Sequence, residues 1–187
     1  MCSLLVHQEL KDIKSYLLTR VEYAKAVREA SERCLKGVMA EYDRANLNLK
    51  LWVAQNPEPQ LPPTNPRASK AAKLKEWFAH EKWQTLKDLH SFKWYQLYGL
   101  AYSSATRLHQ LKLNIKLAEL IENGTYETEC QNYKFFEHYG GVNNPLLTHG
   151  RNVSSALYNH IDVPEHILAE WPEIVAQVRE DMKYRAV

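Results

Sequence analysis

Glycine is scarce in this chain, and so are the patterns that mark strands, membrane spans and export signals. Only six glycines occur among 187 residues, and no strand-length run alternates apolar and polar residues, which disfavours a sandwich or barrel with many tight turns. No run approaches the roughly 20 apolar residues of a membrane span. The apolar patch from Leu4 to Val6 has no preceding basic region and is too short for a signal peptide. We therefore expect a cytoplasmic protein without a targeting signal and without membrane contact.

Cysteines and catalytic motifs are equally sparse. Cys2, Cys34 and Cys130 are odd in number and widely spaced, so we interpret them as plain thiols of an intracellular protein. Glycine-rich phosphate loops, GxSxG, HExxH and CxxC are all absent from the sequence. These absences predict a protein that is not an enzyme and that needs neither a cofactor nor a metal.

Two long segments show the spacing of apolar residues that is typical of helices. In the first, from Gln8 to Gln55, apolar residues recur at three- and four-residue steps. A second stripe begins after Ser69, a residue type that caps helices, and ends at Asn123-Gly124. We expect this second helix to break near Gly99 or Ser103-Ser104.

Between the two segments lies a proline-rich linker. Residues 56–66 contain five prolines, which remove backbone donors and hold their neighbours extended. Two helices of this length need a partner for their apolar stripes, so we predict an all-α fold in which they pair antiparallel as a hairpin. A turn centred between Leu61 and Pro62 would place Ala24 opposite Gly99.

The last third of the chain has shorter segments and more turn residues. We expect a helix at residues 126–138, a loop at residues 139–152, and a last helix that begins after Asp162 or Pro164 and is broken by Pro172. This organisation predicts two domains, a helical hairpin at residues 1–124 and a small helical cap at residues 125–187.

Charge is distributed unevenly along the chain. Residues 67–116 hold ten Lys and Arg against three Asp and Glu, a net charge of +7, whereas residues 117–187 hold five against eleven, a net charge of −6. A basic segment attracts phosphate groups or acidic proteins, and it equally balances the acidic residues of its own chain.

Aromatic residues alternate with lysines inside the basic segment. At 100° per residue, Trp83, Lys87, Trp94 and Tyr98 fall on one side of a helix, where exposed rings could stack on single-stranded bases. Large aromatics at helical spacing more often pack in a core, and residues 92–102 are apolar on nearly all sides, so we expect that stretch to be buried by the cap or by a second subunit. The candidate residues for contact with nucleic acid or a protein partner are Lys75, Lys82, Trp83, Lys87, Lys93, Trp94, Tyr98 and Arg107.

A weaker candidate site lies in the expected loop at residues 139–152. His149 is of the type that serves as a general base, Arg151 could bind an anion, and Asn152 is a polar neighbour. No nucleophile accompanies them, and the spacing of the nearby histidines does not suit structural zinc.

Three functions remain open on these grounds. The first is a non-catalytic protein that binds nucleic acid through its basic, aromatic-rich segment. The second is an adaptor or inhibitor that binds another macromolecule, such as a nucleic-acid-processing complex, and the third is a small enzyme with its site at residues 139–152. Because helical hairpins with uncovered apolar stripes often associate, we also expect a homodimer.

Overall fold

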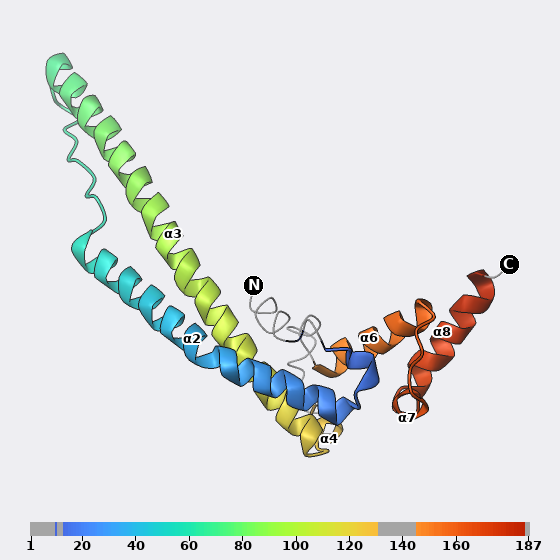
Figure 1. Ribbon diagram of the computed structural model, residues 1–187. Helices are drawn as coiled ribbons and strands as arrows, with labels where there is room; N and C mark the ends of the chain where they lie inside the picture. The colour runs from blue at the N-terminus through green and yellow to red at the C-terminus, as the bar shows by residue number, and fades with distance from the viewer. Residues whose placement is uncertain (1–9, 11–12, 131–144, 186–187) are drawn as a thin grey trace. The chain divides into compact units, whose positions relative to one another are not determined.

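The chain is built from helices (Figure 1). The computed structural model describes residue 10, residues 13–130 and residues 145–185, and no strand occurs in these parts of the chain. The elements in chain order are η1 (Ser15–Leu17), α2 (Arg20–Gln55), α3 (Lys70–Glu122), α4 (Tyr126–Cys130), α6 (Pro145–Tyr158), α7 (Glu165–Leu168) and α8 (Pro172–Arg185). The predicted all-α fold with two long paired helices is therefore confirmed.

The elements form two compact units, and the long helices contribute to both. The first unit contains Met1–Val38 and Arg107–Val187, and the second unit contains Met39–Thr106. The predicted domains, residues 1–124 and 125–187, are each continuous in sequence, and this division stays a prediction.

Helix α2 begins twelve residues later than the sequence pattern predicts. Its start is set by a capping box: the Thr19 hydroxyl accepts a hydrogen bond from the Glu22 N–H at 3.2 Å, and the Glu22 carboxylate accepts one from the Thr19 N–H at 2.8 Å. Leu18 is extended, with φ −105° and ψ 149°. The spacing of Leu10, Ile13 and Leu17 continues the helical period, but the reciprocal cap at Thr19 sets the first residue of α2 at Arg20.

Helix α3 begins and ends where the sequence predicts. The Ser69 hydroxyl accepts a hydrogen bond from the Ala72 N–H at 3.3 Å. At the other end Gly124 has φ 71°, and the Thr125 N–H donates to the Leu120 carbonyl at 3.0 Å, the arrangement of a Schellman motif. The expected break near Gly99 or Ser103-Ser104 is wrong, because the helix continues through these residues and both serine hydroxyls bond back to its carbonyls.

The proline-rich linker lies along the start of α3 within the second unit, and we call residues 57–66 the strap. Three hydrogen bonds fix the strap and its first flanking residue. His90 Nε2 bonds the Asn56 carbonyl at 2.9 Å, Trp83 Nε1 donates to the Pro59 carbonyl at 3.0 Å, and the Asn65 N–H donates to Glu76 at 3.1 Å. The strap therefore runs antiparallel to α3 over its first turns.

The two long helices pair antiparallel, but in a different register from the expected one. Ala24 packs in a buried cluster with Ala118 and Ile121 in the first unit, so the expected pairing of Ala24 with Gly99 is wrong. In the second unit the Trp52 ring lies 4.7 Å from the His90 ring. The register differs because the strap covers the first turns of α3, and α2 therefore pairs with the later turns.

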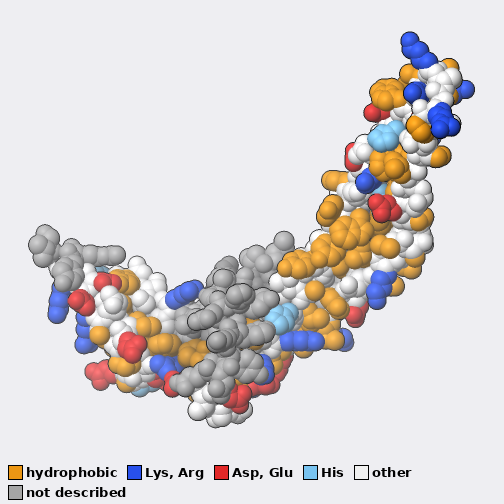
Figure 2. Space-filling view, turned by 180° about the vertical axis from the view of Figure 1, so that it is seen from behind, with side chains coloured by type: hydrophobic (Ala, Val, Ile, Leu, Met, Phe, Trp, Pro, Cys, Tyr) orange, Lys and Arg blue, Asp and Glu red, His pale blue; other side chains and the backbone are white. Residues whose placement is uncertain are grey.

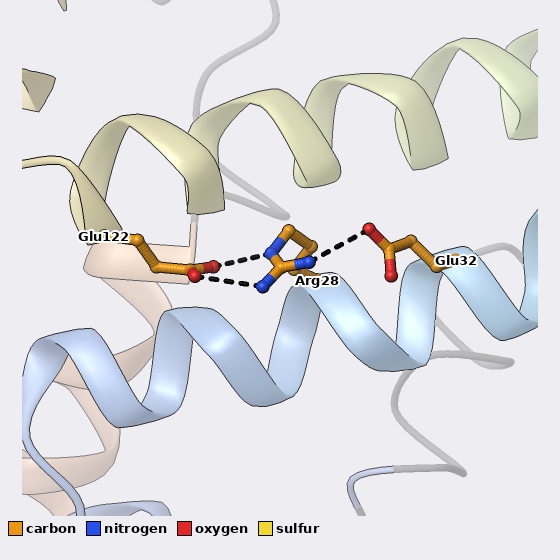
Figure 3. Close-up of polar contacts among 3 residues, drawn as sticks. All are labelled: Arg28, Glu32 and Glu122. Atoms are coloured by element: carbon orange, nitrogen blue, oxygen red, sulfur yellow. Dashed lines mark hydrogen bonds and ion pairs between the residues drawn. The ribbon is translucent and has the colours of Figure 1, made fainter.

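A bidentate ion pair joins the long helices in the first unit (Figure 3). Arg28 Nε and its terminal nitrogen donate to the two Glu122 carboxylate oxygens at 2.7 and 3.0 Å, and Arg28 also contacts Glu32 at 3.2 Å. This pairing lowers the pKa of the Glu122 carboxyl and raises that of the Arg28 guanidinium, chiefly through the hydrogen bonds between them. The planar guanidinium thus fixes the two helices at this level.

The C-terminal segments are more helical than expected. Helix α4 covers the start of the predicted helix at residues 126–138, whose remainder lies outside the described residues. Residues 145–152, expected to be a loop, form the first turns of α6, because Pro145 occupies the helix start, where its missing N–H leaves no bond unmade. Helix α7 begins after Pro164, as predicted, and ends at Leu168, and Pro172 is the first residue of α8. The predicted break in the last helix therefore lies just before Pro172.

Candidate binding surface and cleft

The second unit exposes most of the large apolar side chains that the described residues show to solvent. Fifteen of nineteen exposed large hydrophobic residues lie between Met39 and Thr106, whereas Ala101 is the only hydrophobic residue of that unit that is buried. Figure 2 shows hydrophobic side chains gathered along this unit. Ten of the fifteen come from α3, and they are Leu74, Trp77, Phe78, Leu86, Leu89, Phe92, Tyr95, Tyr98, Leu100 and Tyr102.

Within the second unit, much of the stretch at residues 92–102 is exposed, and its expected burial by the cap or by a second subunit stays a prediction. Phe92 is 62% exposed and Tyr95 67% exposed. One side of this stretch does face the hairpin, since Ala101 is buried and Trp94 and Leu97 are half-buried. The remaining directions are open because α2 and the strap cover only one face of α3.

The predicted stripe of Trp83, Lys87, Trp94 and Tyr98 is not one exposed surface. Trp83, Lys87 and Trp94 are half-buried, and Tyr98 is exposed. Trp83 holds the strap through its bond to Pro59, and the Lys87 ammonium lies 4.9 Å from the centre of the Trp83 ring. These two residues have a structural role, in line with the alternative interpretation of the aromatic stripe.

Rings of α3 stack along the helix at four-residue steps. The Trp94 and Tyr98 rings are 4.8 Å apart and within 9° of parallel, and Tyr98 stacks on Tyr102 at 6.2 Å. Contacts of this kind order aromatic side chains that would otherwise move freely. The exposed aromatic surface is therefore partly preorganised.

The predicted lysines divide in the same way. Lys75, Lys82 and Lys93 are exposed and lie on one flank of α3, within about 20° of one another at 100° per residue. Arg107 is half-buried and belongs to the first unit. Three of the predicted cations are thus exposed and point in a similar direction along α3 in the second unit.

His149 lies in the core of the first unit and not in a loop. Its side chain is fully buried, its Nδ1 accepts a hydrogen bond from Trp171 Nε1 at 3.1 Å, and its Nε2 lies 2.9 Å from the Leu18 carbonyl and 3.1 Å from the Ser15 carbonyl. Burial is the main cause that lowers the pKa of His149. Both ring nitrogens of His149 are therefore hydrogen-bonded within the core.

Its two predicted neighbours have separate positions. Asn152 donates to the Ser15 hydroxyl at 2.7 Å and so helps to hold η1. Arg151 is exposed and lines an open cleft of about 620 Å³ between α6 and α8. The cleft is lined by Gly150, Arg151, Ser154, Ser155, Tyr158, Trp171, Glu173, Ile174, Gln177 and Val178.

Sequence reasoning missed the part of α8 in this cleft and the partners of His149. Trp171 lies next to a proline, which predicts only a helix boundary, and Tyr23 is one residue of a long stripe. The Tyr23 ring stacks on His149 at 5.2 Å, and the Arg20 guanidinium lies 4.1 Å from the centre of the Trp171 ring. No sequence motif marks these contacts, because they join residues more than 100 positions apart.

The described residues contain neither a membrane-spanning helix nor a cluster of metal ligands. None of their helices is long and apolar enough to cross a membrane, and they include no group of three or more His, Cys, Asp or Glu side chains that could hold a metal ion. Compared with models of protein families, with curated proteins and with solved structures, the chain has no significant match.

Proposed function

We propose that this chain is a non-catalytic binding protein that uses the exposed side of α3 to bind another protein. The observation that carries the proposal is the concentration of exposed apolar side chains in the second unit. Eight of those on α3 lie within about 80° of the direction opposite Trp83 at 100° per residue. We call this set the outer face of α3, and it consists of Leu74, Trp77, Phe78, Leu89, Phe92, Tyr95, Leu100 and Tyr102.

The size of this face supports a protein partner. Its side chains are each 55–67% exposed, so together they present on the order of 1,000 Å² if each offers about 200 Å². The largest apolar patch on an ordinary monomer covers about 300–600 Å², whereas a standard interface buries roughly 800 Å² per partner. Aromatic residues are also the type that dominates interface energetics.

The carboxylates near the centre of the outer face favour protein over nucleic acid. Glu81 and Asp88 are exposed between Trp77 and Phe92, within about 40° of the centre of the face. Asp88 is held by a hydrogen bond from Gln84 at 2.9 Å. Two carboxylates beside the rings repel phosphate, whereas a protein partner can offer them hydrogen-bond donors or a lysine.

The test compares two double variants of the purified protein as baits for quantitative affinity capture. Phe92→Ser with Tyr95→Ser removes aromatic area from the outer face. The matched control, Leu47→Ser with Leu51→Ser, removes similarly exposed apolar side chains from α2 in the same unit. We expect the control to retain the proteins that the wild type captures at about 200 mM salt and the face variant to lose them; equal capture by all three baits would contradict the proposal.

Nucleic-acid binding is the second candidate, and the three exposed lysines on one flank of α3 favour it. Its test is fluorescence anisotropy with labelled single- and double-stranded oligonucleotides at about 50 and 200 mM salt, where phosphate-driven binding falls steeply. Binding that is lost at the higher salt and weakened by Lys82→Glu with Lys93→Glu would support this candidate. Absence of binding at both salt concentrations would eliminate it.

A further inference from the structure

The hydrogen bonds of His149 require one protonation state of its ring. The indole N–H of Trp171 can only donate, so Nδ1 of His149 must carry a lone pair. The carbonyls of Leu18 and Ser15 can only accept, so Nε2 must carry the proton. The contacts therefore hold a neutral imidazole with its proton on Nε2.

We propose that His149 is an acid-sensitive latch on Trp171. A proton taken up at Nδ1 would set two N–H donors against each other at a separation of 3.1 Å. That hydrogen bond is then lost, and the indole is released from α6. The inference is independent of the binding function proposed for the second unit, because every residue in it belongs to the first unit.

The release is one-sided. Nε2 carries its proton in both states of the ring, so the bonds from His149 to the Ser15 and Leu18 carbonyls persist when Nδ1 is protonated. Only the contact between Nδ1 of His149 and the indole N–H of Trp171 changes from attractive to repulsive. The latch therefore acts on Trp171 and leaves η1 in place.

Neighbouring groups set how readily the ring takes up this proton. Arg20 of α2, whose guanidinium lies over Trp171, disfavours a second positive charge on His149, whereas the Glu170 carboxylate favours it. Tyr23 stacks on the ring and stays neutral, since burial raises its pKa. Burial dominates for His149 and lowers its pKa from the ordinary 6.5, so the latch opens only below that pH.

Release of the indole would change the cleft between α6 and α8. Trp171 lines the cleft, and its ring fits against Gly150, where an added Cβ would lie 2.9 Å from Cζ3 of the indole. A ring that leaves this position widens the apolar part of the cleft beside Ile174 and Val178. Proton uptake by buried His149 would thereby make the cleft between α6 and α8 more accessible to a ligand.

The test follows the indole N–H resonance of Trp171 and the ring resonances of His149 by NMR as the pH falls from about 7.5 to 4.5. The indole signal is assigned by its absence in Trp171→Phe. The matched variant is His149→Gln, whose amide can accept from the indole and donate to a carbonyl but does not titrate. Circular dichroism at each pH separates local release from unfolding.

In the wild-type protein we expect the Trp171 resonance to move with the same midpoint as His149, while the helical circular dichroism signal is retained. In His149→Gln the Trp171 resonance should stay in place over the same range. A Trp171 resonance that is unaffected while His149 titrates would overturn the proposal, and so would an equal movement in His149→Gln. The first comparison needs only the wild-type protein, so it holds even if the variant does not fold.

Discussion

Replacing Gly150 by alanine should destabilise the first unit, against the usual preference of helices for alanine. Alanine in place of a mid-helix glycine stabilises a helix by about 1 kcal/mol. At Gly150 the new Cβ would lie 2.9 Å from Cδ1 of Ile174 and 2.9 Å from Cζ3 of Trp171. These distances are too short for carbon atoms, so something must move.

The two neighbours differ in their freedom to move. The Ile174 methyl group is the end of a flexible side chain and can rotate away. The Trp171 ring is fixed on one side by its bond to His149 and on the other by the guanidinium of Arg20. Overpacking of a fixed core costs about 1–3 kcal/mol, which exceeds the gain in helix propensity over most of that range.

Gly37→Ala is the matched control. Gly37 lies inside α2 in the same unit, and nothing lies within 4 Å of its added Cβ, so this variant should be more stable than the wild type by about 0.5–1 kcal/mol. Urea denaturation followed by circular dichroism should separate the two variants by about 1–3 kcal/mol. If Gly150→Ala is as stable as Gly37→Ala, the close packing of α6 on Trp171 is refuted.

Three further predictions concern other contacts. Glu122→Gln should lower the melting temperature near pH 7 and flatten its dependence on pH: because Arg28 lowers the folded pKa of this carboxyl, its stabilisation is present above the ordinary value of 4.5 and is lost as pH falls below it. Calorimetry at several pH values checks this, and an unchanged profile would contradict it. Trp83→Phe should lose the bond to Pro59 at a cost of about 1 kcal/mol, so hydrogen exchange and proteolysis should quicken in the strap; unchanged rates would show that the bond does not hold it. Sedimentation velocity should show a homodimer, and a monomer at all concentrations would count against that expectation.

The helix ends show which parts of the fold a sequence can specify. Ser69 and Asn123-Gly124 bound α3 as predicted, because capping depends on residues within one turn of the boundary. The predicted start of α2 is wrong although Thr19 and Glu22 have the spacing of a capping box. The apolar period continues past these two residues, so periodicity alone hides the local cap.

The register of the hairpin, and whether each candidate residue is exposed or buried, depend on contacts between distant segments. The pairing of Ala24 with Ala118 follows from the path of the strap, which no residue of α2 specifies. Lys75, Lys82 and Lys93 are exposed, as lysines usually are. Trp83 has a structural position because the strap supplies its hydrogen-bond partner. His149 has one because η1 and Trp171 supply its partners. In both cases the partners lie far away in the sequence.

The late start of α2 also explains how a histidine can be buried in the first unit. In a helix that continued from residue 8, the Leu18 carbonyl would accept the N–H of Glu22, as every helical carbonyl accepts the N–H four residues on. Here the Thr19 hydroxyl takes that N–H instead, so the carbonyl is left for Nε2 of His149. One hydroxyl thus redirects a backbone acceptor from its own helix to a side chain 131 residues away, and the cap of α2 and the core around α6 form a single hydrogen-bond system.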